Sequence, residues 1–156
     1  MLRSGVVITI VFGLTVGMPR PSLPQANAVR DSVRVLLDRA AADTGSFGDL
    51  PALGDFTGDK APFMALFHLS EAATDSVLLS LVDCFTDTRS TPLRYQHKAL
   101  SRGGLCYLAL HNIAYRETDP SEHWPGNYYG SLTPARLLAA QRAWRRAIRR
   151  HSYNTL

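Results

Sequence analysis

The first 28 residues constrain the rest of the chain most strongly, because they carry the pattern of a secretory signal peptide. Met1–Ser4 holds one positive charge, and Gly5–Met18 is a stretch of 14 uncharged, mostly apolar residues. A proline-containing segment follows and ends in Ala-Asn-Ala at residues 26–28, which matches the A-x-A pattern of a cleavage site. We therefore predict cleavage after Ala28, which leaves residues 29–156 as a single helical domain of 128 residues.

The length of the apolar stretch favours removal over retention in a membrane. A helix of 14 residues is about 21 Å long at ~1.5 Å per residue, short of the ~30 Å hydrocarbon core of a bilayer. An uncleaved anchor is the alternative. We expect a secreted or periplasmic protein with no transmembrane span after processing.

Two cysteines, Cys84 and Cys106, are too few for a disulfide-dense scaffold or a four-thiolate zinc site. In an exported protein two cysteines usually pair, so we predict one Cys84–Cys106 disulfide. The bridge closes a loop of about 22 residues and contributes roughly 3 kcal/mol in the chain-entropy model. The alternative is a reactive thiol at Cys106, which follows Gly103-Gly104 at the start of a predicted helix.

The spacing of apolar residues predicts a mostly α fold, a compact bundle of about five helices. A period of three to four residues marks each helix, and capping residues or prolines mark several of the starts. The predicted helices are residues 33–41, 62–73, 75–85, 105–116 and 133–150. Alternating apolar residues also predict one short β-hairpin at residues 91–101, with its turn at His97-Lys98.

Two long loops interrupt the helical pattern. The first, residues 43–60, is rich in Gly and Asp, and its expected anchors to the core are Phe47, Leu50, Leu53 and Phe56. The second, residues 117–132, carries three aromatic residues: Trp124, Tyr128 and Tyr129. Exposed aromatic side chains bind proteins and sugars, so this loop is a candidate binding surface. The alternative is that the aromatic side chains cover the core.

Charge is distributed unevenly along the predicted mature chain. Residues 29–88 carry a net charge of −6, and residues 89–156 carry +8. The C-terminal helix has no acidic residue between 133 and 151, and five of its arginines are candidate contacts: Arg142, Arg145, Arg146, Arg149 and Arg150. These arginines either pair with the acidic half of the chain or bind an anionic partner. A nucleic acid is not the expected partner, because the mature net charge is only +2.

The sequence holds no zinc-binding, phosphate-binding or nucleophile motif, and we expect no cofactor and no metal. These features predict an exported, non-enzymatic binding protein that uses its basic C-terminal helix to contact a protein or an anionic envelope component. One alternative is a small secreted hydrolase with a site assembled from His111, Asp83 and Glu117. The other alternative is a structural helical unit of a larger assembly.

Overall fold

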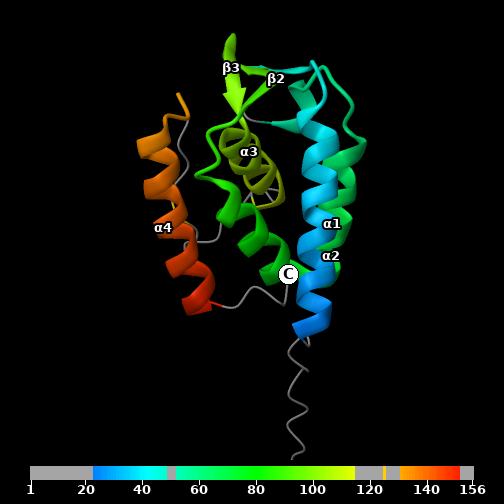
Figure 1. Ribbon diagram of the computed structural model, residues 1–156, viewed down its shortest axis with the longest axis vertical. Coiled ribbons are helices and arrows are strands. Elements are labelled where there is room, and N and C mark those ends of the chain that lie inside the picture. The colour runs from blue at the N-terminus through cyan, green and yellow to red at the C-terminus, as the bar shows by residue number, and fades with distance from the viewer. Residues whose placement is uncertain (1–22, 49–51, 115–124, 126–130, 152–156) are drawn as a thin grey trace, which may run out of the picture.

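The computed structural model describes residues 23–48, 52–114, 125 and 131–151, which form four α-helices and one small sheet (Figure 1). The helices are α1 (Leu23–Ala41), α2 (Ala61–Cys84), α3 (Arg102–Ala114) and α4 (Pro134–His151), and a short 3-10 helix, η1, spans Leu53–Asp55. The strands are β1 (Ser46–Phe47), β2 (Ser90–Tyr95) and β3 (Lys98–Ser101), in the order β1-β2-β3. The prediction of a mostly helical fold is confirmed. The sheet lies at one end of the helices, and α1 and α4 lie on either side of the second half of α2.

Helix α1 begins at Leu23, ten residues before the predicted start. Pro24 lies in its first turn, where a missing backbone N–H costs nothing, so the proline does not prevent the early start. The buried face of α1 consists of Val29, Val33, Leu37 and Ala40. The predicted cleavage site therefore lies inside α1, immediately before the buried residue Val29.

Helix α2 corrects the predicted helix count from about five to four. The two helices expected at 62–73 and 75–85 form one element with a kink at Ala73, whose φ of −151° and ψ of 54° are not helical. The buried hydroxyls of Ser70 and Thr74 donate to the carbonyls of Phe67 and Ser70, at 2.6 and 2.8 Å. These side-chain hydrogen bonds satisfy backbone carbonyl groups next to the kink. The helical segments before and after Ala73 therefore form one kinked helix and are not separated by a polar loop.

By length and composition, α2 is the one helix in the described residues that could cross a membrane. A core helix of a globular protein has the same composition. Helix α2 packs against α1, α3 and α4, and its buried apolar residues form part of the core.

The predicted hairpin is present as β2 and β3. Its turn is at Gln96-His97, one residue earlier than expected, and both residues have positive φ, 49° and 63°. This is the backbone of a type I′ turn, whose twist matches that of the paired strands. The sequence pattern did not predict β1, a two-residue strand inside the Gly/Asp-rich loop that pairs in parallel with β2.

The predicted aromatic anchors of the first long loop are buried. The rings of Phe47 and Phe56 stack with their centroids 4.4 Å apart, and both pack edge-on against Phe63 of α2. This cluster joins β1 and the loop to the helical core.

The Cys84–Cys106 disulfide is also present, with the two Cα atoms 6.0 Å apart, so Cys106 is not a free thiol. The bridge links the end of α2 to the second turn of α3. Gly103 lies inside the first turn of α3, not before it, and its N–H donates to the Asp87 carbonyl at 2.8 Å. A Cβ at Gly103 would lie 2.2 Å from the Phe85 carbonyl oxygen, so only glycine allows this close approach. A disulfide fits an oxidising compartment.

Candidate basic face of helix α4

The predicted C-terminal helix is present as α4, and its buried side fixes the orientation of the whole helix. The main-chain N–H of Arg136 donates to Thr133 Oγ1 at 3.4 Å, the arrangement of an N-cap. Gln141 Nε2 donates to the Val82 carbonyl at 2.8 Å, near the end of α2. The apolar residues of the buried side are Leu137, Ala140, Trp144, Ala147 and Ile148.

Four arginines occupy the opposite, exposed side of α4, and we call them the basic face: Arg142, Arg146, Arg149 and Arg150. Arg142, Arg146 and Arg149 follow the i, i+4, i+7 spacing that places side chains on one side of a helix. Within the described residues, no ion pair or hydrogen bond engages the side chain of any of the four. Among the described residues, no acidic side chain compensates the four positive charges that the basic face presents to solvent.

Arg145 does not belong to this face, although the sequence grouped it with the others. Its guanidinium donates to Asp83 Oδ1 at 2.6 Å, and Asp83 Oδ2 accepts from Arg30 of α1 at 2.8 Å. Asp83 thus bridges α1 and α4 across the second half of α2. Because these side chains are 37–64% exposed, each pair contributes about 0–1 kcal/mol.

The other arginines that form ion pairs in the described chain belong to α1, directly precede β2 or lie at the start of α3. Arg34 pairs with Asp31 at 3.4 Å, and Arg39 pairs with Asp59 at 3.2 Å. The expected pairing between the acidic half and the C-terminal helix therefore involves Arg145 and not the basic face.

A second ionic cluster surrounds Asp87, between α2 and β2. Arg89 donates to Asp87 through its side chain at 2.5–3.1 Å and through its main-chain N–H at 3.1 Å. The Arg89 side-chain hydrogen bonds hold the pKa of Asp87 below its usual value of 3.8, although partial burial opposes this shift. Arg102, only 12% exposed, lies 3.7 Å from Asp87 and 2.5 Å from Asp38 of α1. This cluster fixes the start of α3 to α1, so its role is structural.

The residues proposed for a hydrolase lie in different environments. Asp83 is held between two arginines at the surface, whereas His111 is buried in α3 beside Tyr107. Glu117 lies outside the described residues, as do the candidate binding residues Trp124, Tyr128 and Tyr129. These aromatic residues remain predictions from the sequence.

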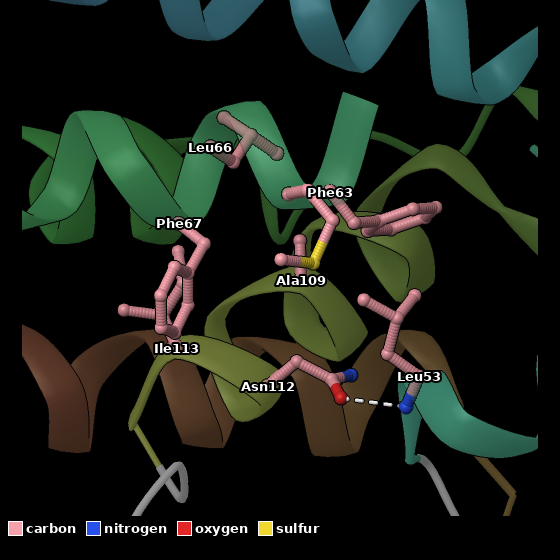
Figure 2. A pocket seen from close by; sticks show the side chains of 8 residues that line it. Leu53, Phe63, Leu66, Phe67, Ala109, Asn112 and Ile113 are labelled. Carbon is pink, nitrogen blue, oxygen red and sulfur yellow. Dashed lines mark hydrogen bonds between the residues drawn. The ribbon is translucent and has the colours of Figure 1, made fainter. Parts of the chain in front are cut away.

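A small apolar hollow of about 120 Å³ lies between α2, α3 and η1 (Figure 2). Its one polar side chain, Asn112, accepts from the Leu53 N–H at 2.7 Å and donates to the Leu108 carbonyl at 2.8 Å. Asn112 thus joins η1 to α3, and these bonds give the residue a structural role. Among the described residues, no group of three His, Cys, Asp or Glu side chains could hold a metal ion.

Comparisons with models of known protein families, with curated proteins and with solved structures found no match.

Proposed function

We propose that this chain is an exported, non-enzymatic binding protein that contacts an anionic protein or envelope component through the basic face of α4. The observation that carries the proposal is the contrast between Arg145, which pairs with Asp83, and the four arginines of the basic face, which pair with no described acid. A fold that needed these charges only for its own stability would place acids beside them.

The energetics of the basic face support this proposal. Like charges at i, i+4 spacing repel by about 0.2–0.5 kcal/mol per pair, and the C-terminal end of the helix dipole offsets part of that cost. An anionic partner would relieve the repulsion. The planar guanidinium forks of arginine match carboxylate and phosphate oxygens in two-point contacts. Salt weakens such an interface, because exposed charges are screened over about 8–10 Å at ordinary ionic strength.

The proposed export is supported by two features of the fold. The Cys84–Cys106 disulfide suits an oxidising compartment. Cleavage after Ala28 would remove the first turns of α1, where none of residues 25–28 is buried, and would leave Val29 and the rest of the buried face in the mature protein.

The experiment that tests this function compares two double variants with the same loss of charge. Arg146→Gln/Arg149→Gln alters the basic face. Arg34→Gln/Arg39→Gln alters exposed arginines of α1, whose surface ion pairs with Asp31 and Asp59 contribute only about 0–1 kcal/mol each. Each protein is expressed with its own leader, purified from the exported fraction and used to capture components of an envelope extract at increasing salt.

We expect the α4 variant to lose the salt-sensitive captured component and the α1 variant to keep it. Equal capture by both variants, or capture that salt does not weaken, would contradict the proposal. Arg145 is unsuitable for this test, because its substitution also breaks the Asp83 bridge.

A further inference from the structure

Two adjoining hollows lie along β3, one of the two edge strands of the described sheet. Their volumes are about 310 and 290 Å³, and both are lined by Ala99, Ser101 and Leu132. Small-molecule sites have volumes from about 300 Å³ upward, so the two hollows lie near the lower limit of that range. Because three residues line both, the two hollows adjoin one another, and we refer to them together as the β3 hollow.

One end of the β3 hollow is largely apolar. It lies between the end of α2 and the start of α4, and its apolar side chains are Phe85, Pro134, Leu137 and Leu138. Leu138 is 38% exposed, although it is a large apolar residue. Burial of this side chain and its neighbours beneath an apolar ligand would remove that surface from water.

The other end of the β3 hollow is polar, with the basic residue Lys98 among its lining residues. It lies at the tip of the hairpin, where Lys98, Gln96, Ser131 and Thr133 line the wall. The ammonium group of Lys98 forms no ion pair or hydrogen bond with any described residue. This end therefore suits an anionic group.

Asp87 lines the apolar end together with Thr86 and Thr88. Its carboxylate accepts hydrogen bonds from Arg89 and lies near Arg102, so its charge is compensated inside the protein. The hollow consequently favours an anion at the Lys98 end over a cation at the Asp87 end.

We propose that the β3 hollow binds a monomeric, single-chain anionic amphiphile, such as a medium-chain fatty acid. The acid group lies at Lys98, and the alkyl chain passes over Ala99 and Leu132 to reach Leu137 and Leu138. The four residues of β3 span about 10 Å at ~3.3 Å per residue, which separates the charged end from the apolar end. This site is distinct from the basic face of α4 and does not depend on the function proposed for that face.

The test titrates decanoate, below the concentration at which it forms micelles, into the exported protein and measures heat by calorimetry. We expect saturable binding at one decanoate per chain. Octanoate, shorter by two methylenes, should bind more weakly by about fourfold for each methylene. Binding without saturation, or equal affinity for the two acids, would overturn the proposal.

Variants separate the two ends of the hollow. Lys98→Gln should weaken decanoate binding by about tenfold and leave decanol binding unchanged, because only the acid contacts the ammonium group. Lys60→Gln is the matched control, since Lys60 is the chain's only other lysine and donates to the Gly54 carbonyl at 2.9 Å. An equal effect of the two lysine variants would contradict the proposed head-group contact.

Ala99→Phe should abolish binding of both ligands by filling the middle of the hollow. Leu138→Gln, at an exposed position, should weaken both ligands and provides the same test if Ala99→Phe does not fold. Circular dichroism establishes that each variant is folded. Unchanged affinity in folded Ala99→Phe, or in Leu138→Gln where that variant is used, would place any bound decanoate elsewhere and overturn the assignment.

Discussion

Replacing Gly103 by alanine tests how closely the start of α3 approaches the end of α2. The new Cβ would lie 2.2 Å from the Phe85 carbonyl oxygen and 3.0 Å from the Asp87 carbonyl oxygen. Ordinary van der Waals contacts of a Cβ begin at 3.4 Å, so the two backbones would have to separate by about 1.2 Å. They cannot do so freely, because the neighbouring Cys84–Cys106 disulfide joins them.

The expected cost follows from three contributions. Overpacking of a close contact costs about 1–3 kcal/mol. Loss of the Gly103 N–H bond to Asp87 O costs a further ~0.5–1.5 kcal/mol. Alanine regains about 1 kcal/mol over glycine through its higher helix propensity. The net expectation is a destabilisation of about 1–3 kcal/mol, enough to lower Tm by several degrees.

Urea unfolding followed by far-UV circular dichroism measures this free energy for the parent and the variant. Gly54→Ala is the matched control, since a Cβ at Gly54 meets nothing within 4 Å. We expect the control to unfold within about 0.5 kcal/mol of the parent. A Gly103→Ala variant as stable as the parent would refute the close approach of α3 to α2.

Three further predictions concern stability. The Cys84→Ala/Cys106→Ala double variant should lose roughly 3 kcal/mol of unfolding free energy in urea. Adding a reductant to the parent, which opens the same disulfide, should cause a loss of about the same size. Because the pKa of Asp87 is lowered in the folded state, the carboxylate adds stability above its usual pKa of 3.8, and that stability is lost as the pH falls through the lowered value. Asp87→Asn should therefore be less stable than the parent at neutral pH, and the difference should narrow in acid; a difference independent of pH would count against this. Trp144→Ala, which removes a 2% exposed side chain from the buried side of α4, should cost about 3–5 kcal/mol in the same assay.

Local sequence patterns predicted much of the fold, because the determining contacts are short in range. Thr133-Pro134 and the apolar spacing that follows mark α4, and alternation of apolar and polar residues marks the hairpin. The disulfide followed from the number of cysteines and the predicted compartment. In each case the residues that decide the structure lie within a few positions of one another, or are the only two of their kind.

The differences arise where tertiary contacts decide the structure. The two residues of β1 are too few to show a pattern, and pairing with β2 defines them. The kink at Ala73 was predicted as a helix boundary, because a sequence pattern does not distinguish a kink from a tight junction. Likewise, the Arg145–Asp83 ion pair joins residues 62 positions apart, so the sequence could not separate Arg145 from the basic face.

Site-specific photo-crosslinking tests the role of the basic face most directly. A photoreactive residue is placed at Arg146 of α4 or, as the matched control, at Arg34 of α1, and the exported protein is irradiated in intact cells. If the basic face binds the partner, position 146 forms a discrete adduct that high salt diminishes, and position 34 does not. An adduct that forms equally at both positions, or at position 34 alone, would contradict the account.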